Sequence, residues 1–489
     1  MPVIPVRYES LKAILPYMEP NTRFQISLRI PSVSSLESRI PLKIENLAFT
    51  GLETKVNEVS YQVRVNRDYG RNETPSDVHR MNQRGGSNDD IDQYGVIIFP
   101  GLDHVLPGDI DLRNRVHRDI PENTEGQAQH LVNVLSGDID LRTTVQRDHW
   151  FNTEESEQTV VQQLRVFKML LAERLNQEYI EDDETRNAVV GGAWNALVET
   201  YRIMTLNYSV ETIQNRIQSL RDSLRPFNNR RDNRIPPSTA WIQFTTRSPK
   251  GITIQRVAYN KYLYEARKTV HTKLFGNRGS SISVKNLNII HHDRILRFPA
   301  ATIFKIENLE VTNWNSREFE RFKQVIHPSS LPIRRLKVSS SVFTADFQHA
   351  IAREAKYLII DNAFANAFAS WTPILLNLTN RRVCLKNENT LNSPNNYMDL
   401  IENWLQQGRP VGTCFHMGIK NEETVKQCLD TLKQRQEVIG SSEKQVQLRI
   451  NAALMLEVSY EMIEQPGRLL RDDQGKWWLR LRVVRRRYD

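Results

Sequence analysis

Short apolar segments recur along the second half of this chain of 489 residues. Five of them, between positions 281 and 387, each join an apolar, β-prone run to a polar or turn-forming break. They align on five apolar positions that are 22, 27, 22 and 25 residues apart: Leu287, Leu309, Leu336, Leu358 and Val383. One such unit cannot bury its own apolar face, so the pattern predicts that the five strands stack in one sheet.

This spacing is typical of leucine-rich repeats, which contribute one strand roughly every 20–29 residues. Asn313, Asn362 and Asn387 each follow an aligned apolar residue by four positions, one position earlier than the usual repeat places its asparagine. We therefore expect an α+β protein whose C-terminal part, 241–489, is an irregular, leucine-rich-repeat-like α/β domain. An ordinary mixed α/β core with Leu-rich strands is the alternative.

The strands of this domain also have copies near the N-terminus. The five letters KIENL at positions 43–47 recur at positions 305–309. The segment VSYQVRV, which follows at positions 59–65, alternates apolar and polar residues as a half-buried strand does. We expect these N-terminal strands to begin the sheet that the later repeats continue.

Residues 8–36 show helical spacing of apolar side chains, so we expect a short amphipathic helix there. Pro20 breaks that helix, Asn21 can cap a second one, and Pro31 ends it. The two elements carry nine residues that we expect to form one exposed apolar face: Leu11, Ile14, Leu15, Tyr17, Met18, Pro20, Phe24, Ile26 and Leu28.

A polar stretch, 67–158, contains an internal duplication. The segment HVLPGDIDLRNRVHRD at 104–119 matches NVLSGDIDLRTTVQRD at 133–148. The paired aspartates lack the later bidentate glutamate of a calcium loop, so no metal site is predicted. We expect both copies to lie in surface loops, where recognition often concentrates.

Three apolar stripes at helical spacing follow in 157–226, and they predict a bundle of two or three helices. The bundle is either packed on itself or offers a partner-binding seam. We expect a basic linker at 227–240, which alternatively could serve as a nuclear import signal. The expected plan is thus 1–38 helical, 39–156 strands with a long polar loop, 157–226 helical insert, 227–240 linker and 241–489 repeat-like domain.

Composition excludes some classes of protein. No apolar run reaches the length of about 20 residues that spans a bilayer, and the first residues lack the pattern of a signal peptide. The three cysteines form no CxxC pair, which fits a reduced cytoplasmic or nuclear protein. The net charge of +9 is spread along the chain without a nucleic-acid-binding motif, so a nucleic-acid partner is disfavoured.

No catalytic set is apparent, and we expect neither an enzyme nor a cofactor. His291 and His292 follow a predicted strand, but only Asp293 stands near them as a further ligand, so we expect no metal site there. Cys414 has His416 two positions later, on the same face of a strand. A thiol–imidazole pair is the one catalytic alternative that this pattern leaves open.

Several segments resemble the nematode F-box C family, which joins a divergent N-terminal F-box to a C-terminal domain of unknown function. They include YESLKAILPYMEPNTRFQISLRIPS at 8–32, PGDIDLR at 107–113, KYLIIDN at 356–362 and LIENWLQQGRPVGTCF at 400–415. The usual Leu-Pro opening of the F-box is not in register, and its closing Trp-containing part is absent. The resemblance implies a subunit that binds a Skp-type adaptor on a cullin scaffold and recruits a target for ubiquitin transfer, with the nine apolar residues above contacting the adaptor.

The target would bind elsewhere. Cations flank successive strand starts, and stacking in register would align them as a basic ladder along one edge of the sheet. We expect five of them to contact an acidic target: Arg334, Arg335, Lys356, Arg381 and Arg382. Lys285 and Lys305 extend the same ladder. A scaffold with a degenerate F-box, a basic nucleic-acid-binding protein, and recognition through the duplicated loops or the helical insert are the alternatives; the oligomeric state is open.

Overall fold

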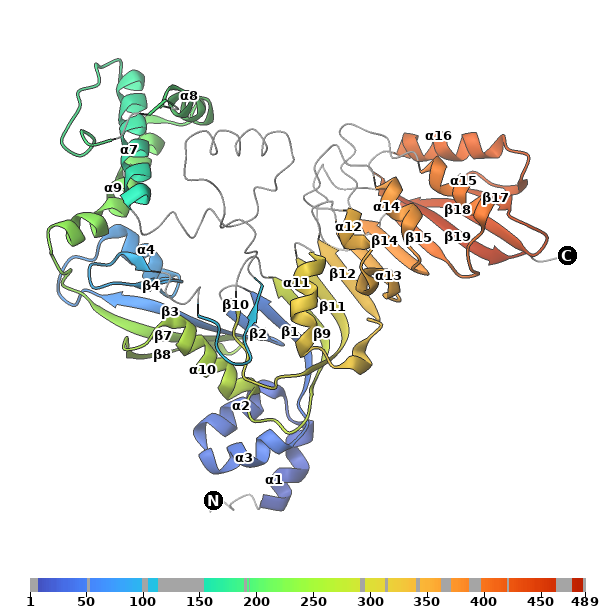
Figure 1. Ribbon diagram of the computed structural model, residues 1–489, viewed down its shortest axis with the longest axis horizontal. Coiled ribbons are helices and arrows are strands. Elements are labelled where there is room, and N and C mark those ends of the chain that lie inside the picture. Colours follow the sequence, from blue (N-terminus) through green and yellow to red (C-terminus); the bar gives the residue numbers. More distant parts are fainter. Residues whose placement is uncertain are drawn as a thin grey trace.

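The computed structural model describes most of the chain, and Figure 1 shows its arrangement. The described residues are 8–50, 53–98, 104–112, 154–188, 191–192, 194–290, 295–312, 315–339, 344–361, 371–386, 397–419, 422–462 and 477–486. The predicted α+β class is confirmed. Within these ranges, no helix has both the length and the apolar character that crossing a membrane requires.

One large curved sheet organises the fold (Figure 1). Its order is β16-β17-β18-β19-β15-β14-β13-β12-β11-β9-β1-β2-β3-β7-β8. The central strands are β1 (Lys43–Thr50), β9 (Ile282–Ile290), β11 (Phe304–Thr312), β12 (Arg335–Ser339), β13 (Leu358–Asp361), β14 (Arg382–Lys386) and β15 (Cys414–Ile419). These seven strands are parallel to their neighbours within this set.

The predicted stacking of the five aligned residues is confirmed residue by residue. Leu287 lies opposite Leu309, Leu309 opposite Leu336, Leu336 opposite Leu358, and Leu358 opposite Val383. Each is at most 1% exposed. The prediction for the N-terminal copy also holds, because Leu47 lies opposite Leu287 in the same sheet. Asn313, Asn362 and Asn387 lie outside the described residues.

Helices cover the face of the sheet on which this leucine row lies, and one continuous core joins them to it. They are α10 (Leu263–Phe275), α11 (Ser316–Phe322), α12 (Thr344–Phe347), α13 (Ala350–Glu354), α14 (Thr372–Asn377), α15 (Met398–Gln407) and α16 (Glu422–Lys433), with the 3-10 turns η3 (Lys323–Val325) and η4 (Pro328–Ser330). Strand, helical connection and parallel strand repeat from β11 to β15, which is the arrangement of a repeat-like solenoid.

Antiparallel strands complete the sheet on both sides. One side has β2 (Glu53–Val56), β3 (Val59–Asp68), β7 (Thr239–Ser248) and β8 (Gly251–Ala258). The other has β16 (Val438–Ser441), β17 (Gln445–Arg449), β18 (Leu454–Met462) and β19 (Trp477–Arg485). Two short pairs, β4 (Asp90–Ile91) with β5 (Ile97–Ile98) and β6 (Ile110–Asp111) with β10 (Ile295–Leu296), and helix α4 (Ser76–Gln83) lie outside the large sheet.

The N-terminal region forms short helices, as expected, but their details differ. They are α1 (Tyr8–Ile14), the 3-10 turn η1 (Leu15–Tyr17), α2 (Pro20–Arg29) and α3 (Pro31–Arg39). Pro31 begins a third helix, because proline is well suited to the first helical turn. Glu19, not Asn21, caps α2 by accepting from Thr22 N. Asn21 is buried and instead donates to the carbonyl of Val56 at 3.0 Å.

A buried ionic network fixes these helices to the body of the molecule. The carboxylate of Glu37 accepts from Arg23 Nε at 3.0 Å and from Arg278 Nη2 at 2.9 Å. All three side chains are at most 5% exposed. Phe24 packs edge-on against Phe275 of α10, with ring centroids 6.3 Å apart. The N-terminal helices therefore share a core with the repeat-like domain.

The helical insert has its own apolar core, as its stripes predict. It comprises α7 (Glu154–Leu175), α8 (Trp194–Met204) and α9 (Val210–Arg231). Buried Leu164, Phe167, Ile213 and Ile217 belong to one cluster between α7 and α9. The three-helix arrangement stands away from the sheet in Figure 1.

The expected linker, 227–240, is a connecting segment only at 232–238. Helix α9 continues through Pro226 to Arg231, and β7 begins at Thr239. Ion pairs hold the end of the helix: Arg230 to Asp92 at 2.6 Å and Arg225 to Asp77. These tertiary contacts offset the backbone hydrogen bond that an interior proline removes.

The described part of the first copy of the duplicated segment, 104–112, is anchored to the body of the molecule, although His104, Val105, Pro107 and Gly108 are exposed. The carboxylate of Asp109 is fully buried and pairs with Lys268 at 2.5 Å and Arg297 at 2.7 Å. Gly108 has φ +88, and a Cβ there would lie 2.5 Å from the backbone nitrogen of Ala300. Charge pairing and close backbone contact thus anchor this part, and the expectation of a surface loop is corrected for Asp109, Ile110 and Leu112, which are buried. The second copy, 133–148, lies outside the described residues.

Candidate functional site

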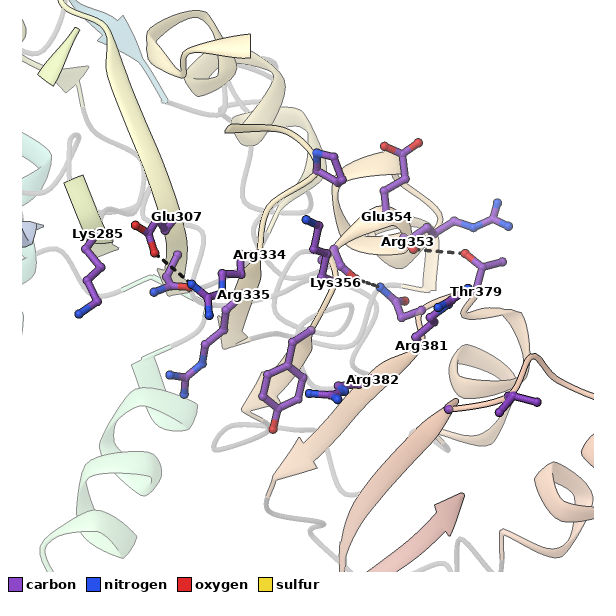
Figure 2. Close-up of a pocket in the computed structure, with 17 residues that line it drawn as sticks. Lys285, Glu307, Arg334, Arg335, Arg353, Glu354, Lys356, Thr379, Arg381 and Arg382 are labelled. Atoms are coloured by element: carbon purple, nitrogen blue, oxygen red, sulfur yellow. Dashed lines mark hydrogen bonds and ion pairs between the residues drawn. The ribbon is translucent and has the colours of Figure 1, made fainter. Parts of the chain in front are cut away.

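A groove of about 1280 Å³ lies where β12, β13 and β14 begin. Figure 2 shows Lys356 between Arg334 and Arg335 on one side and Arg381 and Arg382 on the other. The five cations predicted to contact a target therefore line one groove. Lys285 lines it as well, whereas Lys305 of the predicted ladder does not.

The repeat register explains why these cations meet. Arg335, Tyr357 and Arg382 each come one residue before an aligned apolar position. Because the aligned positions are paired across the sheet, the residues before them are brought to the same edge. Arg334, Lys356 and Arg381, one position earlier, form a second row at that edge. Because the repeats are paired in register, residues at equivalent positions of successive repeats form two adjacent rows of side chains.

Toward β1 the second of these rows carries alternating charges. Lys285 Nζ lies 2.5 Å from Glu45, and Arg334 lies 3.3 Å from Glu307. The hydrogen-bonded carboxylate of Glu45 raises the pKa of Lys285 above its ordinary value. This half of the ladder is therefore compensated within the protein.

Beside this charged row, three asparagines form a hydrogen-bonded ladder across the strands. Asn286 Nδ2 donates to Asn46 Oδ1, and Asn308 Nδ2 donates to Asn286 Oδ1, each at 2.8 Å. In all three strands two polar residues, instead of one, separate the buried apolar positions. The repeated pattern of an apolar residue, two polar residues and leucine thus positions both the charged row and the asparagines.

Toward β14 the cations lack counter-charges. Within the described ranges, no carboxylate lies within ion-pair distance of Arg335, Lys356, Arg381 or Arg382. The groove lining has seven cationic side chains and two glutamates, Glu307 and Glu354, which leaves five positive charges. Arginine presents planar, bidentate donors that match carboxylates and phosphates. This half of the groove is chemically suited to an anionic ligand.

Neutral residues complete the groove and hold its shape. Asn380 Nδ2 donates to the carbonyls of Ala352 and Ala355, at 2.7 and 2.9 Å, and so ties the start of β14 to the segment before β13. Thr379 Oγ1 donates to Arg353 O at 3.2 Å. Burial raises the pKa of Tyr357 to about 12, so its hydroxyl stays protonated and able to donate.

Sequence reasoning did not single out Arg353, Tyr357 or Asn380. Their positions in the groove depend on how each strand start approaches its neighbour. Tyr357 is the exception that the register does reveal, because it occupies the position equivalent to Arg335 and Arg382.

The nine apolar N-terminal residues do not form one exposed face. Leu15 is fully buried with Leu36 and Ile40, Phe24 is 1% exposed, and Pro20 is buried. These three side chains pack on the protein itself, because α2 and α3 fold back onto α1 and onto α10. The expectation that they face a partner is therefore wrong.

Other members of the set remain accessible. Tyr17 is 90% exposed, Ile14 50% and Leu28 44%, while Leu11, Met18 and Ile26 are partly buried. Two residues outside the set add to the exposed apolar surface of this region, Tyr8 at 56% and Ile30 at 47%.

The geometry of Cys414 and His416 gives little support to a catalytic thiol–imidazole pair. Cys414 Sγ lies 3.9 Å from His416 Nδ1. Burial and the nearby Arg480 lower the pKa of His416, so the ring is neutral near pH 7. Burial raises the pKa of the neighbouring Cys384 thiol and of Cys428. His291, His292 and Asp293 lie outside the described residues, within which no cluster of three metal-ligating side chains occurs.

Comparison with known proteins identifies one region. Residues 262–421, which run from α10 past β15 and include every residue that lines the groove, match a family described as "Domain of unknown function (DUF3557)". No curated protein and no solved structure matches the chain. The domain that carries the repeat-like strands is thus the part of this chain that is similar to a recognised family.

Proposed function

We propose that this chain is an F-box-type substrate-recognition adaptor of a cullin-RING ubiquitin ligase, acting in the cytoplasm or nucleus. In this proposal the N-terminal helices bind a Skp-type adaptor, and the groove binds the target protein. Catalysis of ubiquitin transfer would belong to other subunits. The observation that carries the proposal is the apolar surface that α1, η1 and α2 leave in water.

That surface supports a partner-binding role because its side chains are large and lie within one short region. Tyr8, Ile14, Tyr17, Leu28 and Ile30 are all between 44% and 90% exposed. A contiguous apolar patch on a protein surface commonly marks an interaction site, and five large exposed apolar side chains within residues 8–30 favour such a patch here. The region also carries the residues that resemble an F-box. Its anchoring through Glu37 and Phe24 would hold a bound adaptor rigidly relative to the groove.

The groove supports the second half of the proposal. Its uncompensated guanidinium groups favour an acidic protein segment through bidentate pairing. Tyr357, Pro332 and exposed Val411 add apolar surface to the same groove. A protein segment with acidic and apolar side chains could pair with the guanidinium groups and also pack on the apolar surface of the groove.

The adaptor interaction is tested with the purified chain and a purified Skp-type adaptor by isothermal titration calorimetry. We expect binding at micromolar concentration or tighter. Ile14→Asp combined with Tyr17→Asp should weaken it by at least about tenfold, because aromatic and apolar anchors dominate interface energies. Both side chains are accessible, so the variant should unfold like the wild type.

Ile180→Asp is the matched control, because Ile180 is 83% exposed but lies in the helical insert. It should bind the adaptor like the wild type. A wild-type chain that does not bind at micromolar concentration would exclude the ligase role and leave a scaffold with a degenerate F-box.

A second candidate function rests on the five excess positive charges of the groove, which also suit a phosphate backbone. Nucleic-acid binding would weaken steeply as salt increases, with a slope that reflects the number of phosphates contacted. Titration with single-stranded RNA and duplex DNA at two salt concentrations distinguishes the two functions. Binding to an acidic protein segment in preference to both nucleic acids supports the adaptor function.

A further inference from the structure

Strand β8, at one edge of the large sheet, is exposed along its whole length. It pairs with β7 in a continuous register from Trp241 opposite Ala258 to Ser248 opposite Gly251. Within the described part of the chain, no strand pairs with its other side. All eight residues, Gly251–Ala258, are exposed. Such an edge presents a row of backbone donors and acceptors to any strand that approaches.

The side chains of β8 do not protect this edge. Ile252 is 63% exposed, Ile254 53% and Val257 56%. The strand has no proline and no lysine, and its one charged side chain, Arg256, donates to Gln243 Oε1 within the protein at 2.9 Å. Proteins usually avoid an exposed, regular and apolar edge strand unless it pairs with another strand.

The opposite edge of the same sheet shows the usual protection. Strand β16 has four residues, against eight in β8, and its register shifts between Val438 and Gly440. The segment before it carries Glu437, which is paired with Arg435. A short, irregular strand beside charged residues discourages pairing with another chain. The two edges of one sheet are thus built differently, and only β8 retains the features of a pairing edge.

We propose that β8 pairs antiparallel with β8 of a second copy of this chain, so that two sheets become continuous in a two-fold symmetric dimer. A two-fold axis midway between the two Ile254 residues places Ile254 opposite its own copy, Ile252 opposite Arg256 of the second copy, and Thr253 opposite Gln255. Residues that are opposite each other then share a face of the sheet.

The strand is compatible with itself in this register. Apolar Ile254 meets an identical side chain, and Ile252 meets the aliphatic part of an arginine. Directly opposite apolar side chains stabilise antiparallel strands, whereas like charges destabilise them. No two charged side chains of the strand face each other, because Arg256 lies opposite an isoleucine. An isologous contact of this kind closes as a dimer and does not extend to a fibre.

The test measures the mass of the full-length chain in solution by analytical ultracentrifugation at tens of micromolar and physiological salt. We expect twice the monomer mass of 57.0 kDa. Ile254→Lys and Ile254→Glu each place like charges opposite each other across the axis. Each variant alone should dissociate at least about tenfold more readily, because like-charge contacts at an interface are costly.

Mixing the two variants provides the decisive measurement. The introduced lysine of one copy would then lie opposite the introduced glutamate of the other, and this contact is attractive. The mixture should therefore recover a dimer that neither variant forms alone, and this recovery would also show that the substitutions leave the fold intact. Ile180→Lys is the matched control and should remain dimeric, since Ile180 is exposed in the helical insert, between α7 and α8, and not on β8.

A monomeric wild type would overturn the proposal, and β8 would then be free for a strand of another protein. A dimer that persists in Ile254→Lys would overturn it too, because a different surface would be responsible. A mixture that stays monomeric would exclude this two-fold register. None of these outcomes depends on adaptor binding, so they leave the proposed ligase role untouched.

Discussion

Two buried carboxylates hold the parts of this molecule together. Glu37 pairs with Arg23 and Arg278, and so joins the N-terminal helices to the region after α10. Asp109 pairs with Lys268 of α10 and with Arg297, which directly follows β10, and so anchors the described part of the first copy of the duplicated segment. Neither network was apparent in the sequence, because its members are distant along the chain or, for Arg23 and Glu37, lie on two different helices.

Removing one partner of a buried pair leaves the others uncompensated. We expect Asp109→Asn to lower the free energy of unfolding by about 3–5 kcal/mol, because Lys268 and Arg297 then lose their counter-charge. Urea denaturation followed by circular dichroism measures the change. Asp183→Asn is the matched control, since that side chain is 89% exposed, and should change stability by less than about 0.5 kcal/mol. Equal effects of the two substitutions would contradict the anchoring by Asp109.

We expect His271 to make the stability of the protein dependent on pH. Its Nδ1 lies 2.5 Å from Arg297 O and its Nε2 2.6 Å from Thr54 Oγ1, so the neutral ring has both nitrogens satisfied. Burial lowers its pKa from 6.5 to about 4. The unfolded chain therefore takes up this proton at a higher pH than the folded chain. Stability from this group is complete above pH 6.5 and decreases as the pH falls toward 4.

We expect the wild type to lose about 2 kcal/mol more than His271→Gln between about pH 7 and about pH 4.5. Chemical denaturation at the two pH values measures the difference. His79→Gln, at an exposed histidine, should keep the wild-type dependence. An unchanged pH dependence in His271→Gln would show that this ring titrates normally in the folded protein.

At the scale of elements, the leucine row determines the sheet. Leu336 is fully buried and lies opposite both Leu309 and Leu358. Leu336→Ala should lower the free energy of unfolding by about 2–5 kcal/mol, because a cavity forms where two neighbouring strands meet. Leu206→Ala, at a residue 61% exposed, is the matched control. If Leu336→Ala and Leu206→Ala lowered the stability equally in thermal or urea unfolding, the stacking of the leucine row would be contradicted.

The strands of the repeat-like domain could be predicted from the sequence. Which side chains of the N-terminal helices are exposed could not. The buried positions of each repeat strand are apolar in the sequence. Aligning these apolar positions was therefore enough to predict how the strands pair. Helical spacing shows that a face is apolar, but not what covers it. Phe24 is covered by Phe275, and Leu15 by Leu36 and Ile40, contacts that no local pattern reveals.

The same limit explains two other errors. The basic segment after 226 reads as a linker, but Arg230 finds its partner in Asp92. The polar segment around Asp109 reads as an exposed loop, but the Asp109 carboxylate is paired with two cations inside the protein. In both cases polar residues are ordered by distant counter-charges. The groove was predictable in part, because the ladder of cations follows directly from the register of the strands.

At the scale of the whole molecule, the groove and the N-terminal apolar surface lie on different elements of one body. Charge reversal at Arg335, Arg381 and Arg382 should abolish capture of an acidic target, since the groove would then repel it. The leucine row beneath these residues is unchanged, so the variant should stay folded. Reversal of the exposed Arg186, Arg231 and Arg234 changes the net charge equally and should preserve capture.

Parallel affinity purification of three chains, with quantification of the bound proteins, tests directly whether this chain has two separate binding surfaces. The chains are the wild type, the Ile14→Asp/Tyr17→Asp variant and the triple groove variant. We expect the Ile14→Asp/Tyr17→Asp variant to lose the Skp-type adaptor but keep the target, and the groove variant to lose the target but keep the adaptor. Loss of both partners in either folded variant, or of neither in both, would contradict an adaptor with two separate binding surfaces.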